Sequence, residues 1–279
     1  MMMIPKSGTF ESGGLALHYL EWGAPDAPPV VLLHGLRAYG QWFEEFCEPA
    51  AAHLRLIALD QRGRGRSAWA GPGEYTTDHY VADVHALAGA LGLARFGLVG
   101  HSMGGWNAVA YAAKYPGQVR SLVIVDSAPE LDPAGLARIK TELARTPQAF
   151  ANLAEARAFL AGLHHRATPR SLETRLQWML APREDGTLGW RIDPRIFDPN
   201  IPRDPPERMW GELAALACPT LIVRGAITDI VTRASCEQML AALKQGELVE
   251  IPRAGHMIVE DNPQDFNAAV IPFLARTMA

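Results

Sequence analysis

The sequence predicts an α/β fold: a mostly parallel sheet with helices on both faces and an inserted helical cap. Two observations predict it. Short apolar runs alternate with helix-compatible segments over residues 9–127, and the same alternation resumes over 217–277. Between these regions, residues 130–215 lose the β-branched runs and show no evident strand. We therefore expect a core of residues 1–129 and 216–279, with residues 130–215 forming the cap.

The expected strands are short and apolar. Residues 15–21 alternate apolar and polar side chains, which indicates a half-buried strand, whereas the continuous run at 30–33 indicates a buried one. The expected strands are 15–21, 30–33, 54–60, 95–99, 119–125, 220–223 and 248–251.

Helical spacing and stop signals define the expected helices. Thr77 and Asp78 are suitable N-caps for one of them, and Tyr115-Pro116-Gly117 ends another. The expected core helices are 42–53, 77–91, 103–114, 233–244 and 263–276, and those of the cap are 133–145, 148–162 and 170–181.

Composition excludes several classes of function. The formal net charge of −4 gives no basic footprint, so we expect no nucleic-acid partner. No apolar run reaches the roughly 18 residues of a membrane helix, and the N-terminus has no signal-peptide pattern, so we expect no membrane partner. The widely spaced Cys47, Cys218 and Cys236 fit neither a disulfide framework nor a zinc site, which favours the cytoplasm.

The most informative motif lies at residues 100–104. Gly100, Ser102 and Gly104 form a G-x-S-x-G pattern between an apolar run and a helix-compatible run. A strand that turns sharply into a helix leaves little room for side chains, and the two glycines remove the Cβ atoms that would clash. The serine is then exposed near a helix N-terminus, which favours a developing negative charge. Ser102 is therefore the candidate nucleophile.

Four motifs, in order, give the chain a resemblance to the α/β-hydrolase-fold serine hydrolases that carry a cap, a group of esterases and lactonases. The resemblance covers nearly the whole chain outside the cap and implies an eight-stranded sheet. The motifs are His34-Gly35-Leu36, the Asp60–Ser67 turn DQRGRGRS, Gly100-His101-Ser102-Met103-Gly104-Gly105 and Gly255-His256.

A serine nucleophile needs a base and a carboxylate that orients it. His256, in the loop before the last helix, fits the chain order Ser, acid, His. The resemblance places the acid after the strand at 220–223, which favours Asp229, although three residues separate it from Gly225 where many relatives have two. Asp126, at the end of the strand after the elbow helix, is the alternative acid. His34 and His101 are expected to support the loop and the elbow.

An oxyanion needs two preorganised N–H donors. In this fold they are the backbone N–H of the residue after the nucleophile, here Met103, and one from the loop after the strand at 30–33, for which Leu36 is the candidate. We expect no cofactor and no metal site. The adjacent His164 and His165 are not expected to bind a metal together, because neighbouring side chains on a helix point in different directions. The arginine-rich turn lacks a nucleotide-binding pattern.

For each candidate substrate-binding residue, the sequence allows two interpretations: contact with the substrate, or a structural or solvated role. Arg37 is suited to clamp a substrate carboxylate, but a solvated arginine at a helix start is the alternative. Trp106 follows the nucleophile by one turn and is expected to pack in the core, with substrate contact as the alternative. The cap side chains either line a pocket or pack against one another. The cap candidates are Phe150, Phe159, Trp178, Met179 and Trp190.

Together these features predict a cofactor-free hydrolase that cleaves a carboxylic ester or lactone of a small, largely apolar molecule. Two alternatives remain: a C–C bond hydrolase or perhydrolase that uses the same triad, and a non-catalytic small-molecule receptor of the same fold. The expected partner is a small-molecule substrate, and the protein is expected to be a monomer or homodimer.

Overall fold

In the computed structural model, which describes residues 3–197, 201 and 204–278, one eight-stranded sheet organises the core. The strand order is β1-β2-β4-β3-β5-β6-β10-β11. All neighbours from β4 to β11 are parallel, whereas β2 is antiparallel to both β1 and β4. This arrangement confirms the predicted fold class. The strands are β1 (Lys6–Ser12), β2 (Leu15–Trp22), β3 (Pro29–Leu33), β4 (Arg55–Leu59), β5 (Phe96–His101), β6 (Val119–Val125), β10 (Thr220–Gly225) and β11 (Gly246–Ile251).

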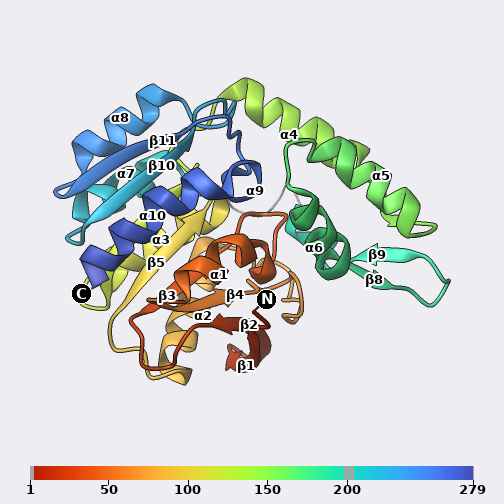
Figure 1. Ribbon diagram of the computed structural model, residues 1–279, viewed down its shortest axis with the longest axis horizontal. Coiled ribbons are helices and arrows are strands. Elements are labelled where there is room, and N and C mark those ends of the chain that lie inside the picture. The colour runs from red at the N-terminus through yellow and green to blue at the C-terminus, as the bar shows by residue number, and fades with distance from the viewer. Residues whose placement is uncertain (1–2, 198–200, 202–203, 279) are drawn as a thin grey trace.

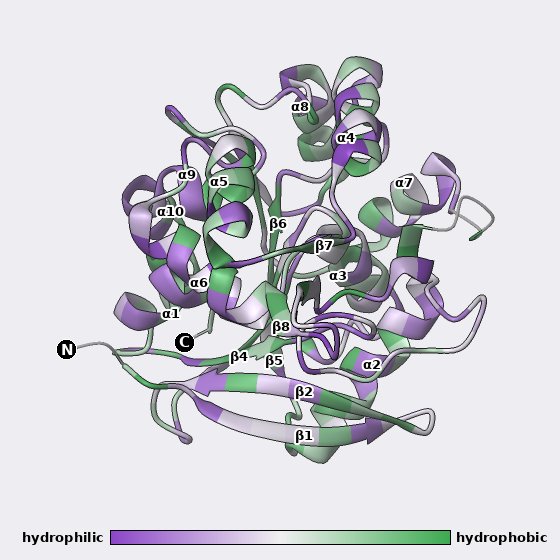
Figure 2. Ribbon diagram, turned by 90° about the vertical axis from the view of Figure 1, so that its right-hand side faces the viewer, coloured by the Kyte–Doolittle hydropathy of each residue, from purple (hydrophilic) through white to green (hydrophobic). Residues whose placement is uncertain are grey.

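Helices cover both faces of this sheet, and β1 and β2 form the lower edge of the molecule in Figure 2. One face packs against α1, α9 and α10, and the other against α2, α3, α7 and α8. The core helices are η1 (Gly40–Phe43), α1 (Glu44–Ala50), α2 (Thr77–Ala90), α3 (Met103–Lys114), α7 (Pro206–Ala215), α8 (Arg233–Ala242), α9 (Ile258–Asp261) and α10 (Pro263–Met278).

The alternation of side chains along β3 shows why its sequence is apolar throughout. Val30 and Leu32 point into one hydrophobic cluster, and Val31 and Leu33 point into the other. All four are fully buried. A parallel strand covered on both faces has no polar side, so it appears in the sequence as a continuous apolar run.

After β6, the chain from α4 to η2 leaves the sheet and builds a separate layer, whose helices α4, α5 and α6 and strands β8 and β9 lie on the right-hand side of the molecule in Figure 1. The sequence predicted only helices here, and that was incomplete, because three short strands pair antiparallel in the order β7-β9-β8. The layer contains α4 (Pro133–Arg145), β7 (Ala149–Phe150), α5 (Leu153–Leu163), α6 (Pro169–Met179), β8 (Leu180–Pro182), β9 (Leu188–Trp190) and η2 (Pro194–Phe197).

Two- and three-residue strands are too short to show a period-two pattern, although Asp185-Gly186 between β8 and β9 is a hairpin signal. Gly186 has a φ of 82°, as that turn requires. Helix α7 lies inside the expected cap range but packs against α3 and α8 of the core. Residues 130–215 therefore comprise both the layer over the strand ends and one core helix.

A buried ion pair ties the cap to the core. Arg175 of α6 and Glu260 of α9 are each about 1% exposed, and the guanidinium donates from Nε and Nη2 to both carboxylate oxygens at 2.7 Å. A second, half-buried cluster joins Arg170 of α6 to Glu44 and Glu48 of α1. Each of these buried charges is compensated only while it contacts the other. The Arg175–Glu260 pair therefore holds α6 in one position relative to α9.

Within the described residues, no helix combines the length and the apolar character that crossing a bilayer demands.

We predict that Arg175→Met lowers the free energy of unfolding by about 3–5 kcal/mol, because it leaves the Glu260 carboxylate buried without a partner. The double variant Arg175→Met/Glu260→Leu is expected to recover most of that loss, since it removes both charges. Urea denaturation of the three proteins measures this. A double variant less stable than the single one would contradict the prediction.

Candidate active site

The nucleophile elbow joins β5 to α3 at Ser102. Ser102 has a φ of 54° and a ψ of −121°, a strained conformation for a residue with a side chain. A Cβ built on Gly104 would lie 2.1 Å from the Leu33 carbonyl oxygen, and one on Gly100 would lie 2.2 Å from the Gly104 oxygen. Both glycines are therefore required by contact, as the sequence predicted, and the turn leaves the Ser102 hydroxyl facing a cavity.

The structure brings Ser102 and His256 together from positions 154 residues apart. Ser102 Oγ lies 3.1 Å from His256 Nε2, and His256 Nδ1 lies 2.7 Å from Asp126 Oδ2. In the tautomer that satisfies both contacts, the serine donates to Nε2 and Nδ1–H donates to the carboxylate. Ser102, His256 and Asp126 therefore form one hydrogen-bonded row.

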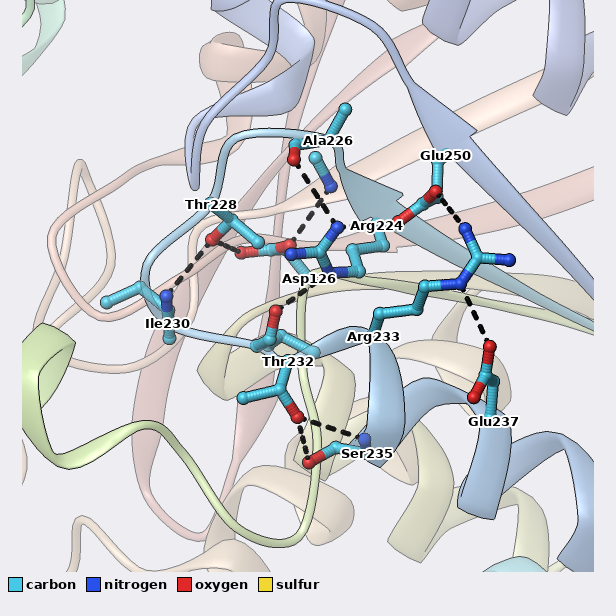
Figure 3. Close-up of polar contacts among 12 residues, drawn as sticks. Asp126, Arg224, Ala226, Thr228, Ile230, Thr232, Arg233, Ser235, Glu237 and Glu250 are labelled. Atoms are coloured by element: carbon cyan, nitrogen blue, oxygen red, sulfur yellow. Dashed lines mark hydrogen bonds and ion pairs between the residues drawn. The ribbon is translucent and has the colours of Figure 1, made fainter.

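Asp126 is held in place by three donors. Its side chain is fully buried directly after β6, with a φ of 44°. Besides His256, Asp126 accepts from the Gly225 N–H at 3.2 Å and the Thr228 hydroxyl at 2.7 Å, and Figure 3 shows Thr228 pointing toward Asp126 from the turn after β10. A buried carboxylate needs such partners to remain charged.

The sequence analysis favours Asp229 as the acid that contacts His256, and the structure contradicts this choice. The Asp229 side chain is 47% exposed and binds Arg138 of α4, with Nη2 donating at 2.8 Å. That arginine lowers the pKa of Asp229. The longer turn after Gly225 brings Thr228, and not Asp229, over the end of the sheet. The alternative acid, Asp126, is the residue that contacts His256.

The loop after β3 has the geometry expected of an oxyanion loop. The Gly35 carbonyl accepts from His34 Nδ1–H at 2.8 Å and from the Ala38 N–H at 3.2 Å. A trans peptide directs its N–H opposite to its carbonyl, so the Leu36 N–H faces away from these donors. Gly35 itself lies against the elbow, because its Cβ would be 3.3 Å from Ser102 Cβ.

The second candidate donor is the Met103 N–H. Met103 is the first residue of α3, where backbone N–H groups have no acceptor within the helix. The next bonds of this turn run from the Gly105 and Trp106 N–H groups to the Ser102 carbonyl. Leu36 and Met103 both line the cavity beside Ser102.

His34 and His101 support the loop and the elbow from beneath. His34 Nε2 accepts from the Gln61 N–H at 3.0 Å, which fixes its other proton on Nδ1. His101 Nε2–H donates to the His256 carbonyl at 2.9 Å, and its ring packs between those of Trp42 and His256. Burial lowers the pKa of His34 to about 4 and that of His101 well below its usual value. Both rings are therefore neutral supports near pH 7.

Arg64, for which the sequence analysis predicts no role, contacts this loop through its side chain. Its side chain is fully buried, with Nε donating to the Leu36 carbonyl at 3.2 Å and Nη1 donating to the Arg62 carbonyl at 2.8 Å. Nη1 also binds the Tyr80 hydroxyl, and Nη2 contacts Met103 Sδ at 3.3 Å. Arg64 thus joins the Leu36 loop to the first residue of α3. An arginine-rich turn alone does not distinguish this buried guanidinium from solvated ones.

A cavity of about 1010 Å³ opens between the cap and Ser102. Three of the candidate substrate-binding residues, Arg37, Trp106 and Met179, line it. The aromatic residues of the cap do not. Phe150, Phe159 and Trp190 pack against one another, and Trp178 lies under the guanidinium of Arg66, 4.3 Å from the ring centroid. For these four side chains, packing was the correct alternative.

Metal-ligating side chains do not gather in the described part of the chain: it holds no group of three or more His, Cys, Asp or Glu side chains placed to bind an ion.

Comparison with known proteins agrees with this geometry. The sequence profile of the alpha/beta hydrolase fold matches residues 28–263. The chain belongs to the α/β hydrolase fold family. It is 32% identical to the 3-hydroxybutyrate-oligomer hydrolase of Cupriavidus necator over 85% of this chain and 86% of that protein. It is 30% identical to the lipase LipV of Mycobacterium tuberculosis over 91% and 96%.

Among solved structures, this α/β hydrolase resembles E-2-(acetamidomethylene)succinate hydrolase with a TM-score of 0.87 and 26% identity, over 97% of this chain and 99% of that one. The names of these relatives denote hydrolases that act on different substrates. The likeness therefore defines the family and the general class of chemistry.

We predict a pH-dependent loss of stability from His34. Its pKa of about 4 in the folded protein lies below the usual 6.5, so the unfolded chain binds more protons between these values. The stabilisation from neutral, buried His34 is fully present above pH 6.5. As the pH falls toward 4, the free energy of unfolding decreases by an amount on the order of 3 kcal/mol. Urea denaturation across this range measures it.

His34→Asn is the matched variant, because asparagine keeps an N–H donor for Gly35 and does not titrate. Its free energy of unfolding should decline less steeply from pH 6.5 to 4 than that of the wild type. Equal slopes in the two proteins would show that His34 is not the source.

Proposed function

We propose that this protein hydrolyses a carboxylic ester or lactone of a small molecule through an acyl-enzyme on Ser102. The observation that carries the proposal is the row from Ser102 Oγ through His256 to Asp126, with contacts of 3.1 and 2.7 Å. A serine hydroxyl becomes nucleophilic only when a base can take its proton, and this row supplies both the base and the carboxylate that orients it.

In the first half-reaction, Ser102 Oγ attacks the ester carbonyl carbon while its proton passes to His256 Nε2. The Asp126 carboxylate accepts the Nδ1–H and stabilises the imidazolium. The Leu36 and Met103 N–H groups hold the oxyanion, and each such donor lowers the barrier by about 3 kcal/mol. The intermediate collapses as Nε2–H protonates the leaving alcohol oxygen, which leaves an acyl-enzyme.

In the second half-reaction, His256 Nε2 takes a proton from water, whose oxygen attacks the acyl carbon. A second oxyanion forms in the same place, and its collapse returns the proton to Ser102 Oγ and releases the carboxylic acid. A lactone follows the same steps, except that the leaving hydroxyl stays attached to the acyl group.

The surroundings support this assignment. The cavity beside Ser102 has a volume of about 1010 Å³, at the upper end of the range for small-molecule sites, and its lining combines apolar side chains with many polar and charged ones. Two of the relatives carry names that denote action on ester-linked substrates, the oligomer hydrolase and the lipase. The cavity supports a small-molecule substrate, and the names of these two relatives favour ester cleavage over the alternatives that use the same triad.

We predict that Ser102→Ala lowers kcat/KM for p-nitrophenyl butyrate by about 10,000-fold or more, because the acyl-enzyme can no longer form. The release of p-nitrophenol measures this, and thermal unfolding checks that the fold is intact. Ser7→Ala, in the edge strand β1, is the control and should retain full activity. Undiminished turnover in Ser102→Ala would exclude the proposed function.

The two carboxylates give a second, paired prediction. Asp126→Asn should lower kcat by about 10,000-fold, since an amide cannot accept the His256 Nδ1–H and favours the wrong tautomer. Asp229→Asn should change kcat by less than about threefold, because that side chain binds Arg138 at the surface. The same assay ranks the two variants. A larger loss in Asp229→Asn than in Asp126→Asn would reverse the assignment of the acid.

A further inference from the structure

Arg37 is a cation of the cavity that forms no ion pair with any described residue. It follows Leu36 directly, is half-buried and lines the cavity beside Ser102. Within residues 3–197, 201 and 204–278, no carboxylate forms an ion pair with its guanidinium and no acceptor binds it; its one defined contact is the Trp190 ring, 5.8 Å away at the centroid. A guanidinium removed from water normally has an anionic partner.

The other buried or bound arginines of the cavity are engaged within the protein. Arg175 donates to both oxygens of Glu260, and Arg138 binds Asp229. Arg64 donates to backbone carbonyls beneath the oxyanion loop. Arg37 thus differs from these three, because none of its N–H groups donates to a residue that the structure describes.

The remaining cations of the cavity lie at its exposed rim. Lys140 and Arg166 are both exposed, so water satisfies their charges. Burial raises the pKa of the Asp261 carboxylate, and the nearby charge of Arg166 opposes this rise. Neither side chain is removed from water to the extent that the half-buried Arg37 is.

Trp190 gives Arg37 a fixed platform. The indole Nε1–H donates to the Pro147 carbonyl at 2.7 Å, and the ring packs edge-on against Phe150 with centroids 5.2 Å apart. At 5.8 Å from the centroid, the guanidinium lies within cation–π range of this anchored ring, a contact that uses none of its N–H groups. The aromatic cluster of the cap therefore contacts Arg37 even though it does not line the cavity.

The local electrostatics favour an anion at this point. Burial lowers the pKa of Arg37, and the charge of Arg175 lowers it further, while Glu142 opposes both. His164 also lines the cavity, and burial, followed by the charges of Arg175 and Arg37, lowers its pKa well below the usual value. A bound anion would offset the repulsion between these cations, and neutral His164 adds a potential N–H donor.

We propose that Arg37 binds a carboxylate of the substrate, so that the esters cleaved at Ser102 carry a free carboxylic acid group. A planar guanidinium fork matches a carboxylate in a two-pronged geometry. Among the described lining residues, Arg37 is the half-buried arginine without an ion pair, and one such guanidinium matches the single negative charge of a carboxylate. This proposal rests on the proposed ester hydrolysis and names its substrate class.

Two matched substrate pairs test the proposal at both ends of the ester. O-butyryl-lactate and O-butyryl-lactamide differ in charge on the alcohol side, and monomethyl glutarate and the methyl ester of glutaramic acid differ on the acyl side. Titration of released acid gives kcat/KM for each compound. In the wild type, the acid of at least one pair should exceed its amide by about 10- to 100-fold, as a charge-assisted contact provides.

In Arg37→Gln, the acid-to-amide ratio of that pair should fall to near one, and Arg37→Lys should restore part of it. The ratio compares two substrates in one preparation, so it does not depend on the fraction of folded protein. Arg157→Gln is the control, because Arg157 pairs with Glu173 at the exposed surface of the cap and does not line the cavity. This control variant should keep the wild-type ratio.

Three outcomes would overturn the carboxylate site: wild-type ratios near one in both pairs, a preference for the acid that survives Arg37→Gln, or hydrolysis of none of the four compounds by a preparation that is active on p-nitrophenyl butyrate. In each of these cases, turnover of p-nitrophenyl butyrate that depends on Ser102 would leave the proposed function standing. Loss of that dependence would instead reject the proposed function itself.

Discussion

The buried carboxylate of Asp126 is the constraint on which the site depends. A charge without solvent must be matched by donors, and here they come from three places: the Gly225 N–H at the end of β10, the Thr228 hydroxyl in the following turn, and the His256 ring after β11. One carboxylate thus connects the ends of three neighbouring strands. The positive φ of Asp126 and of Ser102 is tolerated because the packed sheet around them leaves no alternative path for the chain.

The same reasoning extends from the triad to the cap. The carboxyl ends of parallel strands meet at one edge, which leaves a row of loops without a layer above them. The cap covers these loops, and the buried pair of Arg175 and Glu260 fixes it to the helix that follows the His256 loop. Water screens charges less in this partly covered cavity than at the surface, so a charge without an ion pair there has a larger effect on the free energy. Arg37 is such a charge, and it lies next to the oxyanion loop.

Much of the fold and part of the site follow from local sequence pattern. The apolar runs predicted most of the strands, the glycines around Ser102 predicted the elbow, and the chain order predicted His256. The short strands β7, β8 and β9 were missed because two or three residues carry no periodicity. The choice of acid failed for another reason: both carboxylates follow a strand of the sheet, and sequence position does not define where a turn directs its side chains.

The sequence by itself determined the class of fold and the nucleophile elbow, because each depends on residue type and on spacing along the chain. Only the tertiary structure decided which carboxylate meets His256, which arginines are buried and which cap aromatics pack together. These outcomes depend on distances between segments more than a hundred residues apart, such as Asp126 and His256. Local pattern carries no information on such distances, whereas close packing of the sheet and its loops fixes them.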